Sequence, residues 1–202
     1  MLKQLRYIAF LFFPALCGAQ EIPDMTPPGI STAIVYTDTN QIASNTDAVE
    51  YIDLSRQKLT SIPAVVFQCP NLIYLDLKKN KLENIPAEIG QLNKLRVLNI
   101  SRNRLVRLPK EIGQLSALKS LILNQNEIIE LPPEIGMLSN LAVLDLWGNQ
   151  LDKLPKEIGK LSETLQYLDM RVIFMSREAQ EVIEIMLPET KIFFSQSCNC
   201  KD

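Results

Sequence analysis

Few side chains in this 202-residue chain could support catalysis. The chain contains no histidine, which excludes Ser-His-Asp and Cys-His catalysis as well as the HExxH zinc motif. Its 21 Lys and Arg residues against 23 Asp and Glu give a formal net charge of -2, which does not favour a dedicated nucleic-acid binder. The composition, 47% hydrophobic and 22% charged, is that of a globular protein. We therefore expect no enzyme, no metal and no cofactor.

Asp53 and Asp76 are the carboxylates whose spacing could suggest an acid–base site. They should occupy the same position of two neighbouring strands, about 5 Å apart, and close carboxylates can divide the roles of acid and base. In later segments the same position holds Asn99, Ile122, Asp145 and Asp169. No pocket is implied, so we interpret this row as a solvated face. A calcium site is not expected either, because the clustered oxygen ligands of a calcium loop are missing.

The four cysteines indicate little chemistry. Cys69 occupies a position that later segments fill with leucine, and we interpret it as a small buried apolar residue. Cys198 and Cys200 should lie about 20 Å from it, beyond the ~7 Å Cα separation that a disulfide allows. They could pair with each other, pair with another chain or stay free, and without histidine they are short of metal ligands. We expect a monomer and leave open a dimer through Cys198 or Cys200.

A 23-residue repeat organises most of the chain. Apolar residues return at fixed positions, for example Val49, Leu72, Leu95, Leu118 and Leu141. The L-x-x-L-x-L stretches alternate inward and outward residues, which predicts short parallel strands. An asparagine follows each strand, and its amide can bond to the turn backbone; these are Asn80, Asn103, Asn126 and Asn149.

Proline and glycine recur at fixed positions in the second half of each unit. The prolines fix φ in a segment that pairs with no strand; they are Pro63, Pro86, Pro109, Pro132 and Pro155. The E-I-G stretches after them predict one short helical turn that glycine stops, as at Gly90 and Gly113. No single unit can bury its leucines alone, so the units should stack into one continuous core.

These motifs resemble the leucine-rich-repeat family, whose pattern is L-x-x-L-x-L-x-x-N-x-L. The L-P-x-E-I-G-x-L unit is similar to the class shared by plant intracellular Ras-group-related and bacterial leucine-rich-repeat proteins. The resemblance covers roughly residues 48–175. It implies an α/β solenoid with a curved parallel β-sheet on the concave face and short helical or irregular convex segments. It also implies that the concave face binds a protein.

The outward strand positions and the residues that flank them are therefore the candidate binding site. Tyr, Trp and Arg dominate interface hot spots, and Trp147 is the only tryptophan. The candidate protein-binding residues are Tyr51, Asp53, Tyr74, Asp76, Lys79, Arg102, Trp147, Tyr167 and Arg171. For the tyrosines, packing against neighbouring strands is the alternative interpretation. A glycan remains open as a second kind of ligand.

The N-terminus has the pattern of a secretory signal peptide. Lys3 and Arg6 precede a ten-residue apolar run, and small residues follow up to Ala19. The run is too short to span a membrane, and no other stretch could. We predict cleavage after Ala19 and secretion or a cell-envelope location, so no cytoplasmic signalling role carries over from the family. Lipid attachment at Cys17 is disfavoured, because Leu16 stands where a lipobox has Gly, Ala or Ser.

The remaining segments should cap the two ends of the solenoid. We divide the chain into a signal peptide (1–19), a linker and N-terminal cap (20–47), repeats (48–175, five full and one degenerate) and a helical C-terminal cap with a tail (176–202). Ser176 should begin a helix with Ala179, Val182, Ile183 and Met186 on one face. Short strands are expected at 34–36 and 191–194, and a helical turn at 40–44. A recognition module is the main functional expectation, and a structural or adhesive envelope scaffold is the alternative.

Overall fold

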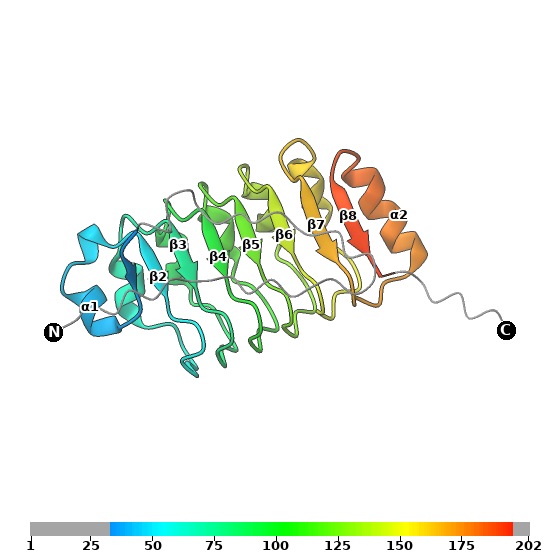
Figure 1. Ribbon diagram of the computed structural model, residues 1–202. Helices are drawn as coiled ribbons and strands as arrows, with labels where there is room; N and C mark the ends of the chain where they lie inside the picture. Colours follow the sequence, from blue (N-terminus) through cyan, green and yellow to red (C-terminus); the bar gives the residue numbers. More distant parts are fainter. Residues whose placement is uncertain (1–32, 196–202) are drawn as a thin grey trace.

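Eight parallel strands run in sequence order through one sheet in the computed structural model, which describes residues 33–195 (Figure 1). The strands are β1 (Val35–Tyr36), β2 (Tyr51–Asp53), β3 (Tyr74–Asp76), β4 (Val97–Asn99), β5 (Ser120–Ile122), β6 (Val143–Asp145), β7 (Tyr167–Met170) and β8 (Lys191–Phe194). The α-helices are α1 (Thr39–Ala43) and α2 (Arg177–Met186). The 3-10 helices are η1 (Thr46–Ala48), η2 (Ala64–Gln68), η3 (Ala87–Gln91), η4 (Lys110–Gln114), η5 (Pro133–Met137) and η6 (Lys156–Leu161). The predicted solenoid is confirmed.

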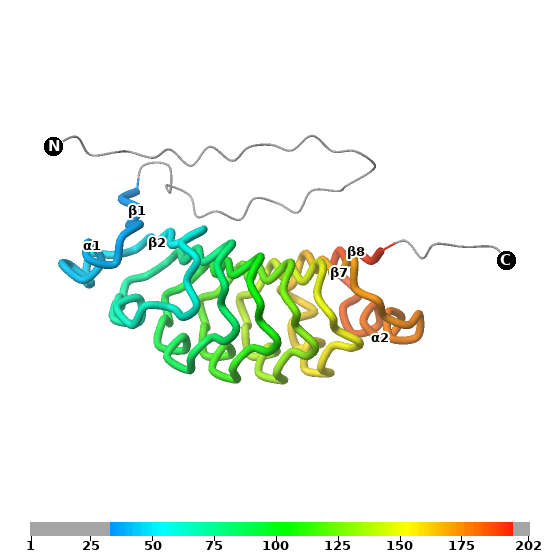
Figure 2. Tube along the Cα trace, turned by 90° about the horizontal axis from the view of Figure 1, so that it is seen from below, coloured from blue at the N-terminus to red at the C-terminus, as the bar shows by residue number. Residues whose placement is uncertain are grey.

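Each three-residue strand, from β2 to β6, places its central residue in the core and its two end residues on the open face. Leu75, Leu98, Leu121 and Leu144 face one another in register and are fully buried. Figure 2 shows the strands along one side of the solenoid and the 3-10 segments along the other. The apolar side chains between these two layers form one core from Ile42 to Leu187. Neighbouring repeats thus share the burial that no single repeat could achieve.

The asparagine row works as predicted from the sequence. The side-chain amide of Asn103 donates to the carbonyl oxygens of Leu77 and Ile100, both at 3.0 Å. Its Oδ1 accepts the backbone N–H of Leu82, also at 3.0 Å. Asn103 is only 8% exposed, so these bonds satisfy backbone groups that would otherwise be buried without partners.

The glycine row has a different role from the one predicted. η3 continues through Gly90 to Gln91, and neither Gly90 nor Gly113 has a positive φ, so glycine does not stop the turn. A Cβ on Gly113 would instead lie 2.6 Å from the backbone oxygen of Glu134 in the next repeat. The expectation that glycine stops the turn is therefore wrong. Glycine is needed here because neighbouring repeats approach too closely for any side chain.

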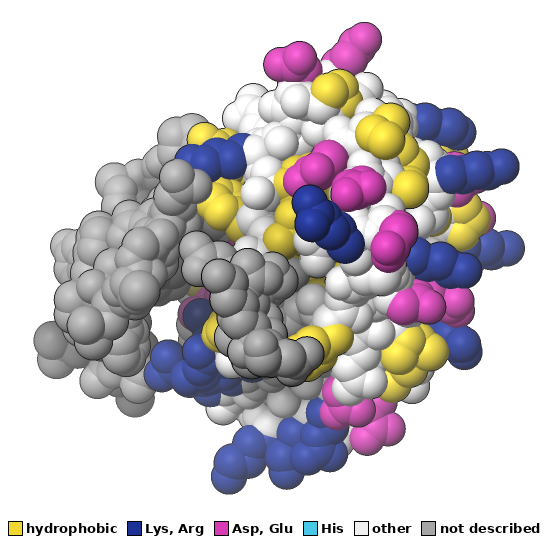
Figure 3. Space-filling view, turned by 90° about the vertical axis from the view of Figure 1, so that its right-hand side faces the viewer, with side chains coloured by type: hydrophobic (Ala, Val, Ile, Leu, Met, Phe, Trp, Pro, Cys, Tyr) yellow, Lys and Arg dark blue, Asp and Glu magenta, His cyan; other side chains and the backbone are white. Residues whose placement is uncertain are grey.

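Both ends of the solenoid are capped. The predicted β1 and β8 are present, and α1 covers the first repeat with Ile42 fully buried. The Ser176 hydroxyl caps α2 by accepting the N–H of Ala179, as predicted. On the predicted apolar face of α2, Ile183 is buried, whereas Val182, at the edge of the stripe, is 52% exposed. Figure 3 shows this end of the molecule, where hydrophobic side chains lie among charged ones.

Candidate functional site

The strand register assembles the predicted outward residues into two rows on the open face of the sheet. Tyr51, Tyr74 and Val97 lie opposite one another in the first row. Asp53, Asp76 and Asn99 do so in the second. Parallel pairing without a register shift produces both rows, since β2, β3 and β4 follow one another at the same spacing.

The first row forms a small apolar cluster apart from the main core. Tyr51, Tyr74 and Val97 are 9%, 4% and 4% exposed and pack with Ala33 and Val35. Tyr51 and Tyr74 therefore present little open surface for a ligand. Side-by-side aromatic and β-branched residues on adjacent strands bury each other's surface, which is the packing alternative considered above.

Asp76, in the second row, is a carboxylate whose pKa the structure clearly raises. Burial raises its pKa to about 6, with a further raising contribution from Asp53, although the backbone N–H of Lys78 lowers it. That N–H donates to Oδ1 at 2.7 Å, and the amide of Asn99 and the hydroxyl of Tyr74 donate to Oδ2. The predicted fully solvated acidic face is thus wrong at Asp76, although Asp53 and Asp76 do lie in register as expected.

The C-terminal half of the face combines aromatic and acidic side chains. Trp147 and Tyr167 are half-buried, so each keeps exposed surface. The backbone N–H of Trp147 donates to Asp145 at 3.1 Å. Burial raises the pKa of Asp145 to about 6, while the amide of Asn124 lowers it by donating to the carboxylate. Asp169 is buried and paired with Arg171, whose pKa this hydrogen bonding raises.

Six exposed cations line the turns that follow β2, β3 and β4; we call them the cationic rim. They form two rows of three, Arg56, Lys79 and Arg102, and Lys58, Lys81 and Arg104. All six are exposed, and within residues 33–195 none forms a salt bridge. The pKa of Lys79 is lowered, first by Arg102 and then by Arg56, because like charges surround it.

The rim occupies backbone positions that favour glycine. Arg56, Lys79 and Arg102 have φ values of 59°, 58° and 58°, in the left-handed region. In the next two repeats the equivalent residues are Gln125, with a φ of 55°, and Gly148, with a φ of 68°. Lys79 and Arg102 were predicted binding residues; Lys58, Lys81 and Arg104 were not, although their 23-residue spacing would have revealed them.

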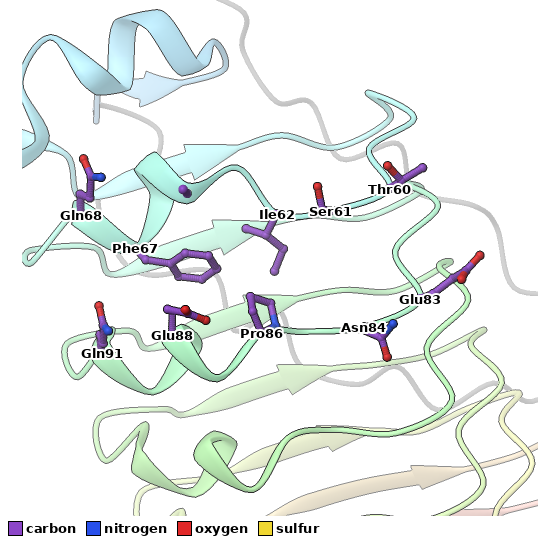
Figure 4. Close-up of a pocket in the computed structure, with 11 residues that line it drawn as sticks. Thr60, Ser61, Ile62, Phe67, Gln68, Glu83, Asn84, Pro86, Glu88 and Gln91 are labelled. Carbon is purple, nitrogen blue, oxygen red and sulfur yellow. The ribbon is translucent and has the colours of Figure 1, made fainter.

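A groove of about 700 Å³, which was not predicted from the sequence, lies on the opposite side between η2 and η3. Figure 4 shows the Phe67 ring lying between these two segments, with Ile62 beyond it and Glu88 and Pro86 along the facing edge. The signal that could have identified it is Phe67 itself, which stands 23 residues before Gly90 in the glycine row.

The structure does not bring together a set of metal ligands or reactive groups. Among residues 33–195, no three His, Cys, Asp or Glu side chains gather in a way that could hold a metal ion. Cys69 is buried and unpaired, as predicted, and burial raises the pKa of its thiol. Cys17, Cys198, Cys200 and the predicted signal peptide lie outside the described residues. Within the described part of the chain, no helix is long and apolar enough to cross a membrane.

Two family models for leucine-rich repeats match the chain, one over residues 47–105 and one, a leucine-rich-repeat region, over residues 110–177. A solved leucine-rich-repeat protein of Leptospira interrogans is 31% identical, with a TM-score of 0.63 over 81% of this chain and 53% of that one. The ectodomain of the Arabidopsis thaliana receptor kinase GASSHO1/SCHENGEN3, in complex with CASPARIAN STRIP INTEGRITY FACTOR 2, is 29% identical, with a TM-score of 0.52. That match covers 73% of this chain and 21% of the ectodomain, so this chain spans about half and a fifth of the two solved chains. No curated protein matches the sequence.

Proposed function

Since the chain is a leucine-rich-repeat protein, we propose that it is a non-catalytic recognition module whose concave face and cationic rim bind a protein with an acidic surface. The rim is the observation that carries this proposal. Three consecutive repeats keep Arg or Lys at a left-handed position, where a residue with a Cβ costs about 1 kcal/mol relative to glycine. They do so while like charges repel one another at Lys79.

The left-handed backbone is shared by the uncharged Gln125, but the repulsion between like charges is particular to the rim and gains the fold nothing in stability. The rim gathers positive charge in one place, although the chain as a whole has a formal net charge of -2. Opposite charge on a ligand would remove the repulsion and accelerate association. The exposed surface of Trp147 and Tyr167 on the same sheet supplies the apolar contacts that hot spots require. The Arabidopsis ectodomain in complex supports protein recognition by this kind of fold.

The test is capture of a ligand by the purified protein from extracellular or host material, followed by measurement of the affinity of the captured ligand. Reversing the rim charge with Lys79→Glu and Arg102→Glu should abolish capture, and Trp147→Ala should weaken it. Lys110→Glu with Lys156→Glu is the matched control, because these exposed lysines begin η4 and η6 on the convex side. Capture that survives both the rim reversal and Trp147→Ala would overturn the proposal.

We propose further that the protein acts outside the cytoplasm, on the strength of the signal-peptide pattern in residues 1–19. Mass spectrometry of the exported chain tests this directly. A mature N-terminus at Gln20 supports cleavage after Ala19, and an acylated Cys17 would replace free secretion by a lipid anchor. An intact Met1 on a chain that stays in the cytoplasm would contradict export.

A further inference from the structure

Phe67 replaces glycine in the row that lets neighbouring 3-10 segments pack together. In the later repeats, Gly113 and Gly136 lie against the backbone of Glu134 and Glu157, with no room for a Cβ, and Gly90 lies against the Gln114 side chain and the backbone oxygen of Glu111. Phe67 precedes Glu88 by the same 21 residues and puts a benzyl group at this junction. η2 accordingly packs more loosely on η3 than η3, η4, η5 and η6 pack on one another. The groove between η2 and η3 is therefore a consequence of one residue.

The groove has an apolar floor and a negative edge. Phe67, Ile62, Ala64 and Pro86 supply the apolar surface. Glu83 and Glu88 line it as exposed carboxylates; neither forms a salt bridge with a described residue, and no Lys or Arg lines the groove. Its volume of about 700 Å³ falls in the range of pockets that hold ligands, roughly 300–1,000 Å³.

Uncharged polar side chains complete the lining. Gln68, Asn84 and Gln91 carry primary amides, and Thr60 and Ser61 carry hydroxyls. Within the described chain the three amides form no side-chain hydrogen bond. An amide offers both a donor and an acceptor, which is what the backbone of an extended polypeptide needs.

We propose that this groove is a second binding site, which takes a short polypeptide segment carrying an aromatic side chain flanked by Lys or Arg. The aromatic group would pack on Phe67 and Ile62. The flanking cation would pair with Glu83 or Glu88, and the amides would bond the backbone of the segment. The site lies on the convex side and is independent of the concave face and its cationic rim, so one can fail without the other.

The probe is a synthetic pentapeptide, acetyl-Ala-Lys-Phe-Lys-Ala-amide, titrated into the full-length protein and followed by two-dimensional NMR. We expect shifts at Gln68, Asn84 and Gln91, and affinity that falls as salt is added. Phe67→Gly, which installs the residue of the later repeats, should close the groove and weaken binding by about tenfold or more. Glu83→Gln with Glu88→Gln should weaken it by a similar factor without altering the apolar floor.

Glu134→Gln is the matched control, because Glu134 is the equivalent of Glu88 at a closed junction. It should bind the peptide as the unmodified protein does. Shifts confined to the concave face, or undiminished affinity in the Glu83/Glu88 double variant, would overturn the proposal even if Phe67→Gly failed to fold. Equal affinity for phenethylammonium, a small amphipathic cation, would overturn the polypeptide as the occupant.

Discussion

Arg171 holds the buried carboxylate of Asp169 two residues before it. The Nη2 atom lies 2.5 Å from Oδ2 and Nε lies 3.0 Å from Oδ1, and the backbone N–H of Arg171 also donates to Oδ1. The Asp169 side chain is 2% exposed, whereas that of Arg171 is 35% exposed. The pair thus neutralises a charge that the sheet has almost removed from water.

Arg171→Ala should destabilise the protein by about 1–2 kcal/mol, because it leaves a buried carboxylate without its cation while solvent partly replaces the exposed guanidinium. The measurement is urea unfolding followed by circular dichroism. Arg177→Ala is the control: Arg177 is 88% exposed in its pair with Glu181, and its loss should change the unfolding free energy little. Equal midpoints for the two variants would contradict this account of Asp169.

Asp76 and Asp145 should make stability fall as pH rises from about 4 to about 6. Their pKa values of about 6 in the native state exceed the ordinary value of 3.8, so in this interval the folded chain binds protons that the unfolded chain does not. The stability that these two carboxyl groups contribute is fully present below about pH 4 and is lost above about pH 6. Urea midpoints at about pH 5 and about pH 7.5 measure it.

Asp76→Asn should flatten this pH dependence, because an amide does not titrate in this range, although its NH2 group would meet the Asn99 amide and the Tyr74 hydroxyl that donate to Oδ2 of Asp76. Asparagine keeps the acceptor for Lys78 N–H, as Asn99 does for Ser101 N–H in the next repeat. Glu178→Gln is the control. The pKa of exposed Glu178 is shifted downward, opposite to that of Asp76, so its replacement should not flatten the pH dependence. A pH profile for Asp76→Asn that matches the unmodified protein would show that burial does not perturb this carboxyl.

Asn103→Ala should cost about 2–4 kcal/mol, because it leaves the N–H of Leu82 and the carbonyls of Leu77 and Ile100 without their side-chain partner. Differential scanning calorimetry should show a clear fall in Tm. Asn93→Ala, at an exposed position ten residues earlier, should leave Tm nearly unchanged. A small effect at Asn103 would mean that water can replace its amide.

Gly113→Ala should destabilise the solenoid by about 1–3 kcal/mol, because the new Cβ would meet Glu134 in the next repeat. Gly159→Ala is the matched substitution at the last junction. There the nearest atom is the Cβ of Met186 at 3.7 Å, an ordinary contact, so the change should be tolerated. Chemical denaturation of both variants compares the two junctions, and similar losses would refute close approach as the reason for Gly113.

The sequence by itself determined the features that recur in every repeat. These features are the strand, the asparagine turn and the segment that begins with proline. Each depends on a few neighbouring residues and on the equivalent residues of the adjacent repeat. A 23-residue period therefore predicts them, and Asn103 and Pro109 show it. The cap formed by Ser176 is local in the same way. Burial of Leu75 follows from strand alternation alone.

Only the tertiary structure decided what depends on the distance between repeats. Whether Tyr74 is open or packed, and whether Asp76 titrates near its ordinary pKa, depends on how much water adjacent strands exclude. The reason for Gly113 is an approach to Glu134, and the groove exists because Phe67 prevents the same approach. Desolvation and steric contact arise between side chains far apart in sequence, so a pattern read within one repeat cannot supply them.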